Sequence, residues 1–450
     1  MDLSALDISR IQFAFVVTFH IIFPAFTIGL AAWLAVLEWR HQATGNPIYR
    51  TLFDFWLKIF AVSFGMGVVS GIVMAFQFGT NWSAMSERTG SIQGPLLGYE
   101  SFTAFILEAT FLGVVLFGRR RASPRMYLTA CVLVALGTTL SSFWIMANNS
   151  WMQVPVGYTI DAAGRMIPTD WRLIIGGHVF LIRWTHMLLA AYLTTAMVVS
   201  ATGAWYLRKG IHTAAAKSML IWGMALMAIF TPIQMGFGHL AGDIIREHQP
   251  AKFAAVEGRW ESGTRAPLVV LAWPDKKAEK NSFELSIPVI GSIVDGGNAD
   301  SYQRGIKDIP VDERAPFLIP FYGFRIMVGA GVLMLFIGWY GTWRNYRHNI
   351  ERSRWFLELT ALSFPMGWIA VMAGWYTAEV GRQPWIVTGL LRTADAVTPS
   401  LTLNHAITSL TLYVLVYVIV FGFGFRYLWI LFQKGPADQN LATIPNRGAL

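Results

Sequence analysis

Long apolar segments separated by short polar stretches dominate this chain of 450 residues. Nine of these segments reach the length of about 20 residues that a helix needs to cross a bilayer. We place them near residues 12–37, 53–78, 95–118, 126–147, 178–206, 218–240, 319–343, 356–376 and 404–433. The pattern predicts an all-α polytopic membrane protein with nine transmembrane helices.

The polar stretches divide the chain into three parts. Residues 1–240 hold the first six predicted helices, and residues 319–450 hold the last three. Between them, residues 241–318 form the only long polar stretch, with a cluster of lysines and a Gly-Gly pair. A connection of this length is usually functional or disordered. We therefore treat residues 241–318 as a separate loop region.

Basic residues in the short loops predict how the chain is oriented. Alternate loops are rich in Lys and Arg: Arg40, Arg50, Arg119, Arg120, Arg121, Arg125, Arg208, Lys209, Lys217, Arg344, Arg347, Arg352 and Arg354. The remaining loops are poorer: Arg88, Arg165, Arg172, Arg382 and Arg392. Because basic loops face the cytoplasm, we expect the N-terminus and residues 241–318 outside and the C-terminus inside.

Composition supports a membrane protein and excludes other classes. Hydrophobic residues make up 54% of the chain and charged residues 14%, whereas soluble domains have about 25% charged residues. The net charge of +9 comes from short loops, so it does not indicate nucleic-acid binding. Cys131 is the only cysteine, which excludes disulfides and covalent haem attachment through a Cys-x-x-Cys-His motif.

Two side chains, His186 and Met327, lie at matching depths in separate apolar segments. Each is about eight residues from the outer end of its segment, or roughly 12 Å at the helical rise of ~1.5 Å per residue. A neutral imidazole facing a thioether is a ligand pair for low-spin haem iron. The alternative is that both side chains only pack against neighbouring helices.

Other polar side chains also lie within or beside the apolar segments. His20 is in the first segment, and a polar ring inside a bilayer is costly and usually functional. Glu100 and Glu108 lie about two turns apart in the third segment, where carboxyl groups could carry protons. Glu379 follows the eighth segment and could pair with Arg382 three residues later. For Glu100 and Glu379 an interfacial position is the alternative.

The outer half of the membrane collects the groups that could hold cofactors. His20, His186, Met327 and Glu379 are all predicted on that side. Electrons would then arrive from outside, and protons needed near the cofactors would have to come from inside.

Four motifs of this sequence are distinctive: GWYTAEVGRQPW (374–385), FRIMVG (324–329), NSWMQVPVG (149–157) and QPAKFAAVEGRWE (249–261). They resemble motifs of subunit I of cytochrome bd-type quinol oxidases. The resemblance covers nearly the whole chain, including nine segments in matching order. The loop after Glu257 is short, so the chain resembles the short-loop branch, which includes cyanide-insensitive oxidases.

This resemblance implies a role for particular residues. It implies His186 and Met327 as axial ligands of a low-spin haem b. It implies His20 and Glu379 as ligands of two high-spin haems, one b and one either d or a further b, without fixing which ligand holds which haem. Further roles follow for Lys252 and Glu257 in quinol binding, Glu100 and Glu108 in oxygen chemistry and proton supply, Arg325 and Arg382 at haem propionates, and Trp375 between haems.

The implied activity is that of a terminal oxidase in the bacterial cytoplasmic (inner) membrane. Ubiquinol or menaquinol would be oxidised at the outer face, and oxygen would be reduced to water with protons from the cytoplasm. Lys252 and Glu257 would lie in the outer loop, away from the iron ligands. The implied partners are subunit II, membrane lipid and a small single-helix accessory subunit.

Three other functions compete with this interpretation. A di-haem membrane cytochrome b predicts paired histidines on facing segments, which this sequence lacks. A haem-copper oxidase needs more histidines than these segments provide. A secondary transporter predicts two similar halves with broken helices, and the sequence has no such internal repeat.

Overall fold

The computed structural model describes residues 3–348 and 350–437. Within these ranges nine helical segments are long and apolar enough to cross a membrane, as predicted. They are Ala5–Thr44, Pro47–Thr80, Ser83–Phe117, Pro124–Gln153, Trp171–Lys209, Thr213–His248, Leu318–Tyr346, Arg354–Val380 and Leu403–Lys434. Each begins earlier than predicted, because helical hydrogen bonding continues past the apolar stretch into polar residues.

Five spans are single helices and four are interrupted. The single helices are α3 (Pro47–Thr80), α6 (Pro124–Gln153), α9 (Thr213–His248), α12 (Leu318–Tyr346) and α15 (Leu403–Lys434). The interrupted spans are α1 (Ala5–Ile22) with α2 (Pro24–Thr44), α4 (Ser83–Tyr99) with the π-helix η1 (Glu100–Phe105) and α5 (Ile106–Phe117), α7 (Trp171–Gly176) with α8 (His178–Lys209), and α13 (Arg354–Leu362) with α14 (Met366–Val380).

Two of these interruptions have consequences for the site. Pro24 has no backbone N–H to continue the helical ladder, so α1 ends at Ile22, two residues after His20, in the middle of the first span. The π-helix η1 begins at Glu100 and changes the angular relation between Glu100 and Glu108. Single turns of π-helix inside α-helices are frequent at functional sites.

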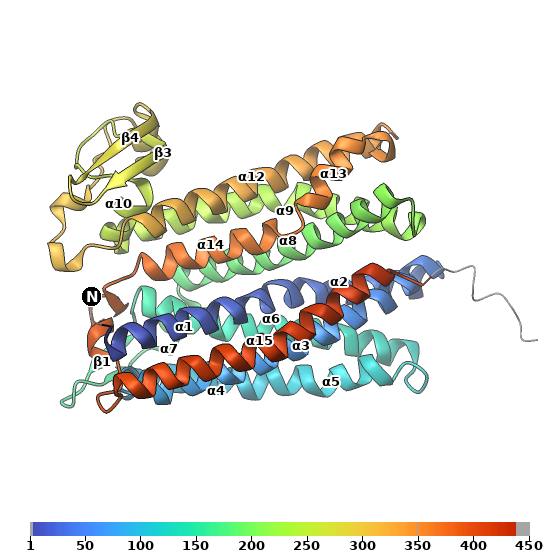
Figure 1. Ribbon diagram of the computed structural model, residues 1–450, viewed down its shortest axis with the longest axis horizontal. Helices are drawn as coiled ribbons and strands as arrows, with labels where there is room; N and C mark the ends of the chain where they lie inside the picture. The colour runs from blue at the N-terminus through green and yellow to red at the C-terminus, as the bar shows by residue number, and fades with distance from the viewer. Residues whose placement is uncertain (1–2, 349, 438–450) are drawn as a thin grey trace, which may run out of the picture.

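The spans form two bundles that share a boundary (Figure 1). In one bundle, α8 and α12 each pack against both α9 and α14. The other contains α1, α2, α3, α5, α6 and α15, and α2 and α6 pack against α8 across the boundary. Small residues allow close approach: a Cβ on Gly203 would lie 2.5 Å from the carbonyl oxygen of Ala216.

The loop region folds into its own small structure at one end of the molecule. It contains α10 (Pro250–Glu257), an antiparallel hairpin of β3 (Leu268–Asp275) and β4 (Lys280–Ile287), α11 (Ile290–Gly296) and the 3-10 turns η2 (Ile306–Asp308) and η3 (Val311–Glu313). Trp260 stacks on Phe317 with ring centroids 4.3 Å apart in its core. Residues 241–248, which we assigned to the loop, are the last two turns of α9.

The remaining strands also lie outside the spans. They form two antiparallel pairs, β1 (Tyr158–Ile160) with β2 (Met166–Pro168) and β5 (Trp385–Val387) with β6 (Leu391–Arg392). Two further 3-10 turns are η4 (Ile350–Arg352) and η5 (Thr393–Asp395). Figure 1 shows the N-terminus, β1 and the β3–β4 hairpin at the same end of the bundle, and α15 ends at the other.

Candidate functional site

His186 and Met327 lie on helices that are diagonal in the four-helix arrangement of α8, α9, α12 and α14. Glycines on the two intervening helices adjoin them. A Cβ on Gly238 of α9 would lie 3.2 Å from His186 Cε1, and a Cβ on Gly374 of α14 would lie 2.9 Å from Met327 Sδ. Both side chains therefore pack closely against positions where any residue other than glycine would displace them.

The hydrogen bonding of His186 is incomplete. Its Nδ1 is buried without a hydrogen-bond partner, and its Nε2 lies 3.3 Å from Gln234 Nε2. Gln234 Oε1 is buried and unpartnered as well. Buried polar atoms normally have partners, so these two fit a site that receives a further group.

His20 is held by a polar contact that determines its tautomer. The Ser70 hydroxyl donates to the Gly67 carbonyl at 2.9 Å, so its oxygen is left to accept from His20 Nδ1 at 3.0 Å. The lone pair of His20 is then on Nε2, the form in which imidazole binds a metal. A glycine is adjacent here too: a Cβ on Gly71 would lie 3.1 Å from His20 Cε1.

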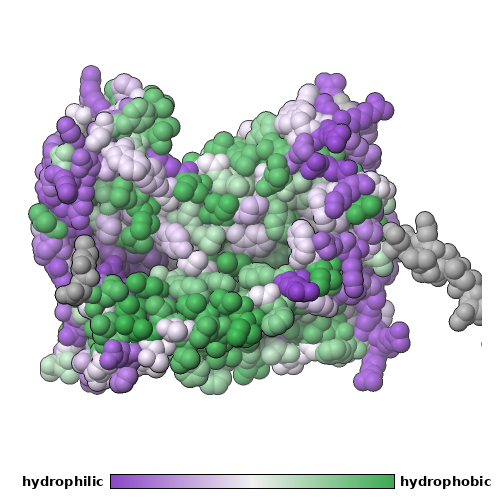
Figure 2. Space-filling model, viewed as in Figure 1, coloured by the Kyte–Doolittle hydropathy of each residue, from purple (hydrophilic) through white to green (hydrophobic). Residues whose placement is uncertain are grey.

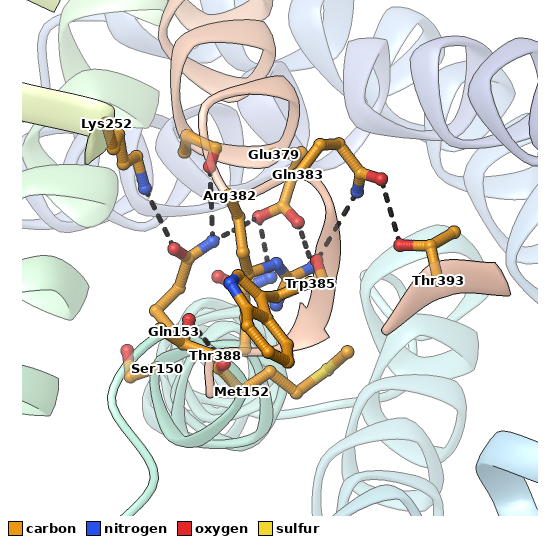
Figure 3. Close-up of polar contacts among 12 residues, drawn as sticks. Ser150, Met152, Gln153, Lys252, Glu379, Arg382, Gln383, Trp385, Thr388 and Thr393 are labelled. Carbon is orange, nitrogen blue, oxygen red and sulfur yellow. Dashed lines mark hydrogen bonds and ion pairs between the residues drawn. The ribbon is translucent and has the colours of Figure 1, made fainter. Parts of the chain in front are cut away.

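Glu379, near the end of α14, is half-buried at the centre of a polar network (Figure 3). Its Oε1 accepts from Asn149 Nδ2 and Gln153 Nε2, both at 3.0 Å. Its Oε2 accepts from Arg382, the ion pair that the sequence predicted. Arg183 joins this network by donating a hydrogen bond to Asn149 Oδ1 at 2.7 Å.

Lys252 belongs to the same network, which corrects the expectation that it lies away from the proposed iron ligands. Its Nζ donates to Gln153 Oε1 at 2.8 Å and to Gln249 Oε1 at 3.1 Å. Gln153, which is 1% exposed, therefore joins Lys252 to Glu379 (Figure 3). Burial lowers the pKa of Lys252 well below its usual value.

Glu257 lies at the other end of α10 among charged groups of the loop. It is buried, and Arg259 and Asp295 beside it form an ion pair at 3.1 Å. Burial, reinforced by the charge of Asp295, raises the pKa of Glu257 to about 7. This carboxyl group therefore changes its charge near neutral pH.

Arg325 and Arg382, the two arginines expected to bind haem propionates, differ in their surroundings. Arg325 donates to backbone carbonyls of the loop, at 2.8 Å to Val256, 3.1 Å to Val270 and 2.5 Å to Val269. Its donors thus fasten the loop to α12. Arg382, in contrast, has two buried donors, Nε and Nη1, without a partner. Those donors fit an anionic group.

Glu100, the first residue of the π-helix, and Glu108, which follows it in α5, both face α6. Glu100 Oε1 accepts from Ser141 Oγ at 2.9 Å. Glu108 is buried, and its Oε1 has no hydrogen-bond partner. Gly137 of α6 makes room for it, since a Cβ there would lie 2.6 Å from Glu108 Cγ.

Trp375 of α14 packs into two apolar clusters, one around Trp82 and one around Ile21.

Sequence reasoning missed several residues of this site. Asn149, Gln153 and Arg183 were not singled out, although the first two lie in the quoted NSWMQVPVG motif. Gly71, Gly238 and Gly374 were missed because nothing in a linear sequence shows which glycine faces which ligand. The available signal was Arg183 inside an apolar segment and the two amides just beyond the end of another.

The ligand chemistry fits haem better than a bare ion. In the part of the chain that the structure describes, no three His, Cys, Asp or Glu side chains gather to hold a metal ion. Haem iron needs only one or two axial ligands from the protein, because the porphyrin supplies the other four. Isolated side chains next to glycines on neighbouring helices meet that need.

Comparisons with known proteins give consistent results. Residues 8–436 match the family model described as cytochrome bd terminal oxidase subunit I. The chain is 34% identical to cytochrome bd ubiquinol oxidase subunit 1 of Bacillus subtilis (strain 168), over 98% of this chain and 97% of that protein. It is 32% identical to cytochrome bd-II ubiquinol oxidase subunit 1 of Escherichia coli (strain K12), over 87% and 89%. The bd oxidase structure from Geobacillus thermodenitrificans is similar with a TM-score of 0.89 and 30% identity, covering 96% of this chain and 99% of that chain.

Proposed function

The chain belongs to the cytochrome bd terminal oxidase subunit I family, and from this membership we propose how its residues oxidise quinol and reduce oxygen. It is the haem-bearing subunit of a quinol:oxygen oxidoreductase and a multi-pass protein of the bacterial inner membrane. Subunit II is its partner. The relatives named above are ubiquinol oxidases, while a further Bacillus subtilis relative, 27% identical, is named a putative menaquinol oxidase, so both quinols are candidates.

Three haems complete the proposed electron path. His186 and Met327 would hold a low-spin haem b as axial ligands, and His20 and Glu379 would each hold a high-spin haem, one b and one d or a further b. When bound, the haems would carry single electrons, and the two high-spin haems would supply the chemistry of oxygen reduction. Arg382 supports propionate binding better than Arg325, because its two buried donors lack partners and those of Arg325 are occupied.

Quinol oxidation is proposed at α10, at the end of the bundle that the positive-inside rule predicts to lie outside. Lys252 would orient the head group, and Glu257 would accept a proton from it. The link from Lys252 through Gln153 to Glu379 supports a quinol site close to a haem. The protons released there would leave to the outside.

Oxygen reduction is proposed between His20, Glu379 and Trp375, with Glu100 and Glu108 supplying protons from the cytoplasmic side. The absence of a hydrogen-bond partner at Glu108 Oε1 supports a carboxyl group that exchanges protons with water or with Glu100. Charge separation would arise from the opposite origins of electrons and protons. A small single-helix accessory subunit stays a prediction from the family resemblance.

The observation that carries the proposal is a glycine packed closely against each of three proposed ligands. His20, His186 and Met327 each adjoin a glycine of a neighbouring helix, at 3.1, 3.2 and 2.9 Å from a Cβ placed there. A matched substitution tests it: Gly374→Ala should displace Met327 and weaken the low-spin haem signal. Gly331→Ala on α12, where a Cβ meets open space, should leave the spectrum unchanged. Equal, normal spectra in both variants would contradict the proposal.

The pH dependence of quinol oxidation tests the role of Glu257. Its carboxylate, the form that accepts a proton, is present above the pKa of about 7. The steady-state rate should therefore rise as pH increases through about 7, and Glu257→Gln should remove this step. Glu261→Gln, a change at an exposed carboxylate of the same loop, is the control and should keep the profile. A wild-type profile in Glu257→Gln would exclude Glu257 as the base.

Gln153→Leu should disturb quinol oxidation and the haem held by Glu379 together. The variant removes an acceptor from the buried Lys252 and a donor from Glu379, and an unpaired buried donor costs about 1–3 kcal/mol. We expect a higher KM for quinol and a shifted midpoint potential of that haem. Gln249→Leu removes the other acceptor of Lys252 without touching Glu379, so it should raise KM and leave the potential unchanged. A Gln153→Leu protein with an unchanged potential would refute the link.

A further inference from the structure

The β3–β4 hairpin turns an apolar face away from the protein. Its strand β4 alternates between polar and apolar residues, and alternate residues of a strand lie on one face. In register, Leu271 lies opposite Leu285. Five large side chains make up this apolar hairpin face and are 48–63% exposed: Leu271, Trp273, Phe283, Leu285 and Ile287. Val269 and Ala272 on the other face are buried in the loop core. Exposure of this apolar face to water is therefore unfavourable.

The hairpin is fastened to the first two turns of a membrane span. Tyr322 of α12 donates its hydroxyl to the Ala272 carbonyl at 2.8 Å, and Arg325 donates to the Val269 and Val270 carbonyls. These two residues are four and seven positions after Leu318, where α12 begins, so β3 is bound roughly 6–10 Å along the helix. The hairpin therefore lies at the level where α12 enters the bilayer.

The apolar hairpin face continues the exposed apolar surface of α12, a helix long and apolar enough to cross a membrane. Near its start α12 exposes Leu318, Ile319 and Ile326, at 47–51%. In Figure 2 a green patch covers the hairpin at the upper left, with purple atoms toward the end of the molecule and the green belt of the helices on the other side. The hairpin's apolar surface is thus next to the membrane belt.

We propose that the apolar hairpin face inserts into the boundary between lipid head groups and acyl chains, and anchors the loop to the membrane. A tryptophan at this level is typical of the membrane interface. Lys276, Lys277 and Lys280, at and beside the hairpin turn, are complementary to anionic head groups. The contact with lipid follows from exposure and position alone, independently of the proposed quinol chemistry.

One consequence of the anchor does rest on the proposed function. Arg325 also donates to the Val256 carbonyl, at the end of α10, at 2.8 Å. The anchored hairpin and α10 are therefore fixed to the same guanidinium group. An anchor of this kind would hold Lys252 and Glu257 where a lipid-soluble quinol leaves the bilayer.

Spin labels on neighbouring positions of β4 test the proposal. Cys131, the only cysteine, is replaced by alanine, and a nitroxide is attached at Leu285→Cys or at Glu284→Cys. Both positions are exposed, and they lie on opposite faces of the hairpin, because Leu285 pairs with the exposed Leu271 and Glu284 pairs with the buried Ala272. The complete oxidase is placed in nanodiscs of phosphatidylethanolamine and phosphatidylglycerol, and accessibility to oxygen and to a water-soluble nickel chelate is measured.

The three outcomes separate the occupants of this face. Lipid contact predicts that the label at 285 is relaxed by oxygen and protected from nickel, with the reverse at 284. Equal access of nickel to both labels would overturn the proposal in favour of water. An immobile label at 285 that neither reagent reaches would overturn it in favour of a protein partner. None of these readings uses quinol or haem chemistry, so a failure of the proposed function would leave them unchanged.

Discussion

Replacing Met327 with leucine should convert the low-spin haem to a high-spin form or release it, with the fold intact. Leucine keeps the apolar volume of methionine, so the free energy of unfolding should fall by less than about 1.5 kcal/mol. It cannot donate a sulfur lone pair to iron. The low-spin signal in the visible and electron paramagnetic resonance spectra should disappear, and quinol-driven oxygen consumption should fall with it.

The same helix offers a matched control. Met334 is two turns further along α12, where it is buried in an apolar cluster with Ile337 and Phe356. Met334→Leu makes the same chemical change away from His186, so its spectrum should equal that of the wild type. A normal low-spin signal in Met327→Leu, together with full activity, would refute the assignment of this ligand.

Glu108→Gln should slow oxygen reduction by about 10²-fold or more, the range expected when a proton-transferring group is lost. Glutamine keeps the size and the hydrogen-bonding capacity of glutamate but cannot carry a proton. Because Glu108 packs against Gly137 of α6, whereas α10 packs against α9 and α12, the KM for quinol should change little. Turnover measured across a quinol titration separates the two parameters.

Glu87→Gln is the control for this experiment. Glu87 lies on the same span, in α4, and is exposed, so its loss should leave turnover near the wild-type value. If Glu108→Gln turns over normally, or changes only the KM, then Glu108 packs or binds and protons follow another route.

The long apolar segments predicted the membrane architecture, because a helix that crosses a bilayer must satisfy its own backbone hydrogen bonds. The nine spans, and their order, required only hydropathy and length. Their ends were less predictable: α9 continues to His248 through polar residues that hydropathy assigns to the loop. The break at Pro24 and the π-helix at Glu100 also depend on local geometry that a hydropathy profile does not contain.

The sequence indicated those site residues that are polar groups within apolar segments, where burial is energetically costly. It did not indicate residues that act through a neighbouring side chain. His20, Glu108 and His186 are conspicuous as polar groups in apolar segments. Lys252 was expected away from the iron ligands, because it belongs to a polar loop outside the predicted membrane segments. Only the fold shows that Gln153, on a third segment, joins the two.

The most direct test of haem binding by this chain is the visible absorption spectrum of the purified oxidase, recorded oxidised and after reduction by quinol. We expect the signals of a low-spin haem b and of high-spin haem, with a red-shifted chlorin band if haem d is present or additional haem b signal in its place. A purified protein that shows no haem absorption would contradict the account.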